Sequence, residues 1–265
     1  MYTIEYNNEI KTFLHMVKSA GTSVHLGIIE ASHFYDKYKV HVNQRHASIR
    51  NLPKQYSKHK KFIVLREPHK WYRSFYRFFL GVEGYMSWAI NDPKDDGYIY
   101  PIDPNEFVRR LINMKDTLTK FPNKARVFRN ILRSQGHMHF ITGYFESDFH
   151  PDDAKTMQQF DMSLFKWFWK AVGGEQAIYI PMDRLDLIEK EFHIIVPHIN
   201  ETDPSKPDIQ FTPETIELIK ETHKEFYDML DAFDENHYKT YKNYKQKKEE
   251  ISRTRRRNSR LNKRK

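Results

Sequence analysis

The feature that most constrains the fold is a short buried strand that runs through a tight turn into a helix. Residues 12–17 are mostly apolar and predict a buried strand, and residues 22–37 carry an apolar stripe at helical spacing. Two further strands are predicted at 37–42 and, from the run KFIVLR, at 61–66. Strand, helix and strand at these spacings favour parallel βαβ units. We therefore predict an α/β fold in which helices flank a parallel sheet.

The rest of the chain predicts more helices and one more strand. Residues 83–175 are mostly helical in pattern with irregular connections, and AIYIPM at 177–182 predicts a strand. A helix is predicted over 212–233, with Thr212 as its N-cap and a proline at its first position. A chain of 265 residues is long enough to bury one sizeable core. We place a single domain at 1–238.

Charge is unevenly distributed along the chain. The net charge is +9, but residues 239–265 hold 13 of the 44 Lys and Arg residues and only two of the 35 acidic residues. The other 238 residues carry 31 basic and 33 acidic side chains. Because the apolar period also ends near this point, we predict a disordered basic tail at 239–265. A basic site in the folded body must be local rather than a broad nucleic-acid surface.

Three missing features limit the class of protein. The chain has no cysteine, which excludes disulfides and thiolate chemistry. No stretch approaches the roughly 18 consecutive apolar residues of a membrane-spanning helix. The first residues lack the basic and apolar regions of a signal peptide. We therefore expect a cytoplasmic protein.

The turn after the first strand, KSAGTS at residues 18–23, has the composition of an anion-binding loop. A strand that turns into a helix directs unpaired backbone N–H groups at one point, and the helix dipole adds positive charge there. Small residues at Ala20 and Gly21 let an anion approach the backbone. Lys18 precedes the glycine, whereas it follows the last glycine in the P-loop of nucleotide hydrolases, so an ATP or GTP hydrolase is disfavoured. A purely structural turn with a surface lysine is the alternative.

A second anion site is predicted where the strand at 61–66 ends. Arg66 lies at its C-terminal end and Ser74 near the start of the following helix. Ligands of open α/β sheets bind outside the carboxyl ends of strands, so Arg66 is expected on the same edge as Lys18. A guanidinium and a hydroxyl suit a phosphate, although a surface ion pair and a solvated serine are the alternatives. Two anion sites on one edge predict a ligand with two separated anionic groups.

These segments resemble the sulfotransferases that use 3′-phosphoadenosine 5′-phosphosulfate (PAPS), in particular the carbohydrate-type branch. HMVKSAGTS resembles the loop that holds the phosphosulfate, and FIVLREPHKWYRSFY resembles the element whose arginine and serine hold the 3′-phosphate. RHASIRNLP, YIPMDRLDLIEKEF and the stretch from HINETD to LDAF resemble further elements in the family's order. The likeness spans residues 13–233 and is weak through 83–175, the region that contacts the acceptor in such enzymes.

Four positions depart from the family's pattern. Val17 stands where the family has proline, Ser19 where it has threonine, and Glu67 where it has Asn or Asp. Trp71 stands where an arginine is expected, although Arg73 follows it closely. None of these changes removes a ligand-binding group named above, so they bear on the subfamily more than on the chemistry.

The resemblance implies a P-loop-like fold with a largely helical acceptor-side insertion at 83–175. The implied reaction transfers a sulfuryl group from PAPS to a hydroxyl of a glycan or glycoconjugate by in-line displacement, which releases adenosine 3′,5′-bisphosphate. Lys18 would stabilise the bridging oxygen as it leaves, and no metal is implied. The implied cofactor-binding residues are Lys18, Ser19, Ala20, Gly21, Thr22, Ser23, Arg66, Ser74 and Lys206.

The acceptor hydroxyl also needs a general base, and histidine has the appropriate pKa. His46 matches the histidine of the family's HATA segment and is the candidate, with a surface loop histidine as the alternative. Gln135 matches a glutamine that some members place near the acceptor.

Two other functions stay open. The basic tail at 239–265 would suit a nucleic-acid-binding protein, or would dock the domain on an acidic partner. The chain could also be a catalytically inactive relative that binds the nucleotide without turnover.

Overall fold

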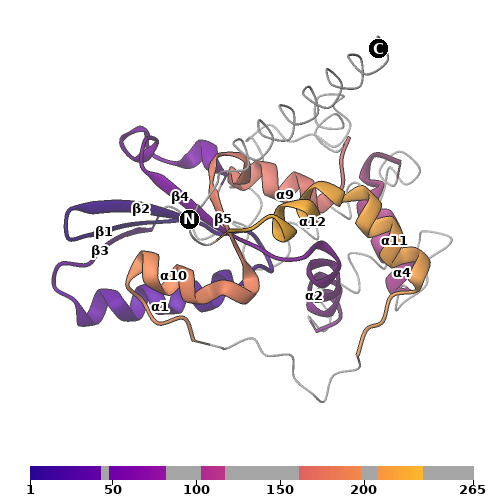
Figure 1. The fold of residues 1–265 in the computed structure, drawn as a ribbon, viewed down its shortest axis with the longest axis horizontal. Coiled ribbons are helices and arrows are strands. Elements are labelled where there is room, and N and C mark those ends of the chain that lie inside the picture. The colour runs from indigo at the N-terminus through magenta and orange to yellow at the C-terminus, as the bar shows by residue number, and fades with distance from the viewer. Residues whose placement is uncertain (43–47, 82–102, 117–160, 198–207, 235–265) are drawn as a thin grey trace, which may run out of the picture.

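The chain folds around one mixed five-stranded sheet with helices on both faces (Figure 1). The computed structural model describes residues 1–42, 48–81, 103–116, 161–197 and 208–234. The strands are β1 (Tyr2–Tyr6), β2 (Glu9–Leu14), β3 (Lys39–Val42), β4 (Lys60–Leu65) and β5 (Ile178–Pro181), in the order β3-β1-β2-β4-β5. Strands β2, β4 and β5 are parallel neighbours, and β1 runs antiparallel to both β2 and β3.

The predicted parallel sheet is therefore correct for three neighbouring strands but not for β1. The first residues form a β-hairpin that the pattern of strand and helix did not predict. Asn7 and Asn8 both have positive φ, 49° and 65°, as a two-residue type I′ hairpin turn requires. The hairpin inserts β1 beside β2, so β3 pairs with β1 instead of with β2.

Side chains of the strands alternate between two hydrophobic cores. Phe62 and Ile63, neighbours in β4, belong to different cores. One core is closed by α1 (Gly21–Phe34) and α10 (Leu185–Phe192), which lie on the same side of the sheet (Figure 1). The other core is closed by α2 (Pro68–Gly81), α4 (Pro104–Ile112), α9 (Leu164–Val172), α11 (Pro213–Thr222) and α12 (Lys224–Asp231). Short 3₁₀ turns occupy Ile49–Asn51, Lys54–Tyr56, Gly174–Gln176 and Met182–Arg184.

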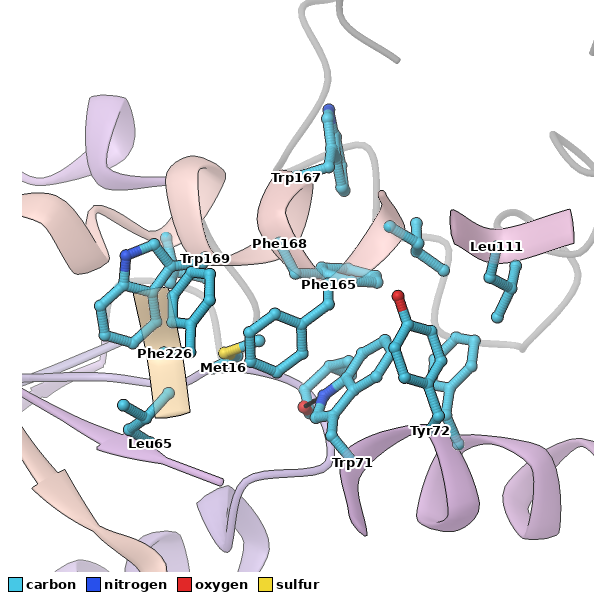
Figure 2. Close-up of a cluster of buried hydrophobic side chains, with 14 of the residues drawn as sticks. Met16, Leu65, Trp71, Tyr72, Leu111, Phe165, Trp167, Phe168, Trp169 and Phe226 are labelled. Carbon is cyan, nitrogen blue, oxygen red and sulfur yellow. Dashed lines mark hydrogen bonds between the residues drawn. The ribbon is translucent and has the colours of Figure 1, made fainter. Parts of the chain in front are cut away.

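The second core is dominated by aromatic rings from α2, α9 and α12 (Figure 2). Trp71 stacks on Phe75 with ring centroids 4.8 Å apart and meets Phe165 edge-on at 5.3 Å. The tryptophans of the KWFWK stretch, Trp167 and Trp169, are 5% and 2% exposed. These two rings are therefore core residues.

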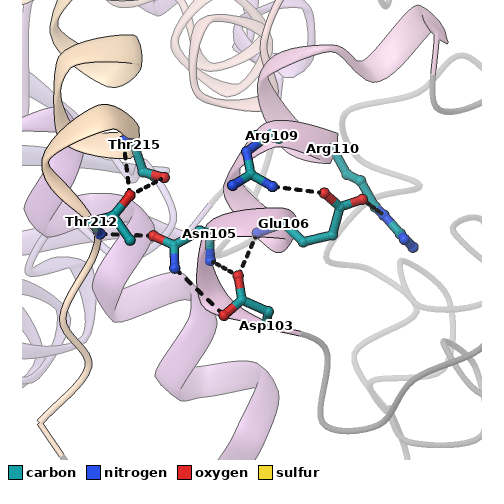
Figure 3. A network of polar contacts seen from close by, with 7 residues as sticks. All are labelled: Asp103, Asn105, Glu106, Arg109, Arg110, Thr212 and Thr215. Atoms are coloured by element: carbon teal, nitrogen blue, oxygen red, sulfur yellow. Dashed lines mark hydrogen bonds and ion pairs between the residues drawn. The ribbon is translucent and has the colours of Figure 1, made fainter.

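A polar network fixes α4 against the start of α11 (Figure 3). Asp103 caps α4 by accepting hydrogen bonds from the N–H groups of Asn105 and Glu106. The amide oxygen of Asn105 then accepts a hydrogen bond of 2.9 Å from the N–H of Thr212. Thr212 is the N-cap of α11, as predicted, and its hydroxyl accepts from the N–H of Thr215.

The predicted helix over 212–233 is two helices, because the chain breaks at His223. This residue is fully buried, and its Nε2 lies 3.0 Å from the hydroxyl of Tyr72 in α2. It ends α11 and serves as the N-cap position of α12. Burial, assisted by the charge of Lys166, lowers the pKa of His223 to about 3.

We predict that acid destabilises the fold through His223. The unfolded chain binds a proton on this histidine near its ordinary pKa of 6.5, while the folded chain does not until about pH 3. The unfolded state therefore holds more protons between these values, and stability falls as the pH decreases. As the pH is lowered from about 6 to 4, the free energy of unfolding of the wild type should fall by roughly 1 kcal/mol per pH unit more than that of His223→Gln.

Urea unfolding at several pH values measures this difference. His33→Gln is the matched control, because it makes the same substitution at an exposed histidine of α1. Equal pH dependence for the wild type and His223→Gln would contradict the prediction.

Candidate functional site

The connection from β2 to α1 forms a strained loop, here called the anion loop (residues 16–23). The N–H of Ser19 donates to the carbonyl of Met16 at 3.3 Å and closes a β-turn. Lys18, the third residue of that turn, has a φ of 59°, and Val17 before it has a negative φ, so the turn is of type II. Ala20 is also left-handed, with a φ of 54°. Left-handed residues at alternate positions are typical of backbone arrangements that bind anions.

The first turn of α1 supplies donors to the same loop. Val24 donates to the carbonyl of Ala20, whereas the N–H groups of Ala20, Gly21 and Ser23 donate no hydrogen bond within the part of the chain that the structure describes. The N-cap residue, Ala20, has no side-chain group that could cap this helix end. These N–H groups and the helix dipole make the anion loop suitable for an oxyanion, as the sequence predicts for residues 20–23.

Ser19 differs from the other predicted members of the loop. It is 1% exposed, and its N–H is already bonded to Met16. Its hydroxyl is buried and has no hydrogen-bond partner among the described residues. The N–H of Ser19 thus completes the turn and is not among the loop's available donors.

Gly21 is required by close packing rather than by its backbone angles. A Cβ at this position would lie 1.7 Å from the imidazole of His15. His15 is 4% exposed, so the ring has little room to move away. Any larger residue at position 21 would push apart the end of β2 and the start of α1, and with them the anion loop.

Two side chains from the next strand and helix hold the anion loop. The indole N–H of Trp71 donates to the carbonyl of Val17 at 2.7 Å, and Nη1 of Arg66 donates to the carbonyl of Lys18 at 3.1 Å. The predicted loop and the predicted second anion site therefore meet at one edge of the sheet. The structure brings Arg66 and the Lys18 backbone into direct contact.

Arg66 belongs to an arginine cluster, defined here as Arg66, Arg73 and Arg77. Burial, with repulsion from Arg77 and Arg73, lowers the pKa of Arg66 to about 10. The Nε atoms of Arg66 and Arg73 are buried without a hydrogen-bond partner, and Arg73 makes no ion pair within the described ranges. Arg77 pairs with Asp208 at 2.8 Å. Because uncompensated buried cations are costly, this cluster is suited to binding an anion.

Ser74, the predicted partner of Arg66, lies on α2 together with Arg73 and Arg77 and is half-buried. Its hydroxyl makes no hydrogen bond to the residues that the structure describes. Arg73 was not predicted as a ligand, although Arg73 and Arg77, four residues apart, share one face of α2. The arginine cluster could have been predicted from that spacing together with the position of Arg66 at the end of the preceding strand.

A cleft of about 580 Å³ opens at the carboxyl ends of β4 and β5. Such edges are where open α/β sheets bind ligands, and this volume lies in the range of small-molecule sites. Tyr227 and Phe233 supply aromatic surface, while Arg66 connects the cleft to the arginine cluster. The full lining is Leu65, Arg66, Glu67, Lys70, Pro181, Met182, Asp183, Arg184, Tyr227, Leu230, Asp231 and Phe233.

His69 supports one wall of this cleft and was not singled out from the sequence. Its backbone N–H donates to the hydroxyl of Tyr227 at 3.2 Å, its Nδ1 lies 3.1 Å from the same oxygen, and the two rings are stacked. Glu67 lies 3.3 Å from Nδ1. Burial is the main cause that lowers the pKa of His69, with Glu67 opposing it. Burial also raises the pKa of Tyr227 to about 12. The cleft wall therefore holds a neutral imidazole and a neutral phenol at pH 7.

Several predicted residues lie outside the described ranges: His46, Gln135, Lys206 and the tail at 239–265. Within the described ranges, no three His, Asp or Glu side chains are grouped as metal ligands. In the same ranges no helix is both long and apolar enough to cross a membrane. The structure thus places the anion loop, Arg66 and Ser74, and it leaves the predicted base and acceptor contacts untested.

Comparison of the chain with protein-family models, with curated proteins and with solved structures gave no match. The likeness to sulfotransferases therefore rests on the local sequence segments alone.

We predict that Ala20→Gly stabilises the protein by about 0.5–1 kcal/mol, because glycine adopts positive φ without the steric penalty that alanine incurs. Ala31→Gly is the matched control. Ala31 is buried within α1, where glycine should lower stability by about 1 kcal/mol or more. Chemical denaturation measures both changes. A destabilising Ala20→Gly would show that the left-handed geometry of the anion loop is incorrect.

Proposed function

We propose that the protein is a PAPS-dependent sulfotransferase that transfers a sulfuryl group to a hydroxyl of a glycan or glycoconjugate. The observation that carries this proposal is the hydrogen bond from Arg66 to the carbonyl of Lys18. It joins two anion-binding features, the anion loop and the arginine cluster, at the carboxyl edge of three parallel strands. This edge also supports a P-loop-like arrangement, in which a strand enters a helix through an anion-binding loop.

A bisphosphorylated nucleotide matches the chemistry of the three features at this edge. The N–H groups of the anion loop suit the 5′-phosphate, and the guanidinium groups of Arg66 and Arg73 suit a 3′-phosphate. The cleft beside Arg66 has the size and aromatic surface for a nucleoside. A simple nucleoside monophosphate would leave one cationic site unfilled, so the arrangement favours PAPS.

The proposed reaction is an in-line displacement that depends on positioning and charge stabilisation. The acceptor oxygen attacks sulfur as the bond from sulfur to the bridging oxygen breaks. Lys18 and the N–H groups at the start of α1 stabilise the negative charge that develops on the departing phosphate. His46 is the proposed base that takes the acceptor proton, and Gln135 is proposed to contact the acceptor. In this scheme the protein's own cations and N–H groups supply the positive charge, so the step needs no metal.

We predict that adenosine 3′,5′-bisphosphate stabilises the folded protein. At 100 times its dissociation constant the ligand should add about 2.7 kcal/mol, which raises the melting temperature by roughly 5–10 °C for a chain of this size. AMP should give a smaller shift because it lacks the second phosphate. Absence of a shift, or an equal shift with AMP, would contradict the proposed donor. Binding without transfer of radiolabelled sulfate from PAPS to any glycan would identify an inactive relative.

We predict that Arg73 contributes more to nucleotide binding than Ser74. Hydrogen bonds to charged groups contribute about 1.5–3 kcal/mol, so Arg73→Gln should weaken binding of adenosine 3′,5′-bisphosphate by roughly ten- to a hundredfold. AMP affinity should change far less, since it carries no 3′-phosphate. Titration calorimetry measures both affinities.

Two controls accompany this measurement. Ser74→Ala should change the affinity for the bisphosphate by less than Arg73→Gln does. Arg109→Gln removes a half-exposed arginine of α4 and should leave binding unchanged. Wild-type affinity in Arg73→Gln would place the second phosphate elsewhere.

A further inference from the structure

We propose that Trp71 is a positioning residue that holds the anion loop in its anion-binding conformation through the carbonyl of Val17. The inference rests on the proposed function only for the identity of the ligand. The conformational part concerns the loop itself and can be tested without any ligand.

The orientation of one peptide bond distinguishes the two common forms of the turn at residues 16–19. Types I and II differ by a flip of the central peptide, here the one between Val17 and Lys18. Type II places the third residue at positive φ, as observed for Lys18. Lysine disfavours this region and glycine does not, so the residue at position 18 by itself favours type I. Something else must hold the central peptide.

Trp71 supplies that constraint. Its indole N–H donates at 2.7 Å to the carbonyl of Val17, which is the oxygen of the central peptide. The bond is buried, and the carbonyl would lose this donor if the peptide flipped. The loop therefore keeps the type II form because a buried donor fixes the carbonyl direction.

The tryptophan is itself held in place by the aromatic core (Figure 2). It is fully buried, stacked on Phe75 and met edge-on by Phe165. Its backbone N–H donates to the carbonyl of Glu67 in the first turn of α2. The core thus determines the position of a donor that acts on a surface loop.

The peptide orientation determines what an anion meets. In a trans peptide the N–H points opposite to the carbonyl, so a carbonyl held toward Trp71 leaves the N–H of Lys18 directed away from the core. After a flip, a carbonyl oxygen would point where the N–H had been and would repel an oxyanion. Arg66 bonds the following carbonyl, but it is also a proposed ligand, so a substitution there would change both the loop and the binding contacts. Trp71 is not a proposed ligand, so a substitution there tests the positioning of the loop alone.

Trp71→Phe tests the proposal, because it keeps an aromatic ring and removes the donor. Titration calorimetry with adenosine 3′,5′-bisphosphate should show affinity at least tenfold weaker than in the wild type. The one-bond Cα–Hα coupling of labelled Lys18, measured by NMR without ligand, should change from the value of a positive φ to that of a negative φ. Trp169→Phe is the matched control, because it changes an equally buried tryptophan of the same core and should alter neither measurement.

Each result has a definite meaning. Wild-type affinity in Trp71→Phe, or a positive φ at Lys18 in that variant, would overturn the proposal. If the wild type does not bind the bisphosphate, the proposed function fails, while the Lys18 coupling still decides the role of Trp71. If Trp71→Phe does not fold, incorporation of benzothienylalanine at position 71 keeps the bicyclic shape without the N–H, and the same two measurements apply.

Discussion

Two hydrogen bonds from neighbouring elements to the carbonyls of Val17 and Lys18 determine the geometry of the edge where all the candidate features meet. A buried peptide carbonyl needs a donor, and a loop between strand and helix has no regular partner to provide one. Here the donors come from Arg66, directly after β4, and from Trp71, in the first turn of α2. The same bonds that satisfy the loop also join the first strand–turn–helix unit to the second. A change in either unit therefore alters the other.

This arrangement produces an edge that is strained and positively charged. Lys18 and Ala20 adopt left-handed conformations without being glycine, and the arginine cluster is partly buried. Backbone strain of this kind costs about 1–3 kcal/mol per residue and persists where surrounding structure imposes it. At Lys18, we propose that the aromatic core imposes it through Trp71. A bound oxyanion would offset part of the cost of the backbone strain and of the buried charge. It would pair with the arginine side chains and accept hydrogen bonds from the N–H groups that have no partner among the described residues.

The sequence predicted the features that depend on local pattern. The strand–turn–helix around Gly21, the strand that ends before Arg66 and the N-cap at Thr212 all follow from spacing and from residue preferences. It did not predict what tertiary contacts decide. The break at His223 follows from a buried contact with Tyr72, and the requirement for glycine at position 21 follows from the His15 ring. The Asn7–Asn8 turn had a local signal, but the absence of a glycine made that signal weaker than the Asn-Gly pair typical of such hairpins.

Trp71 stands where the sulfotransferase element that residues 62–76 resemble has an arginine. Residues 71 and 73 lie about 200° apart around a helix that turns 100° per residue, so Arg73 cannot replace an arginine at position 71. Position 71 faces the aromatic core and bonds the loop, whereas Arg73 shares a face with Arg77, and the charges of both act on Arg66. In this chain, the bond to the loop and the positive charge are therefore supplied by different residues of α2. We propose that Trp71 holds the anion loop, while the positive charge of α2 lies on the face that carries Arg73. A phosphate bound by the arginine cluster would lie against that face.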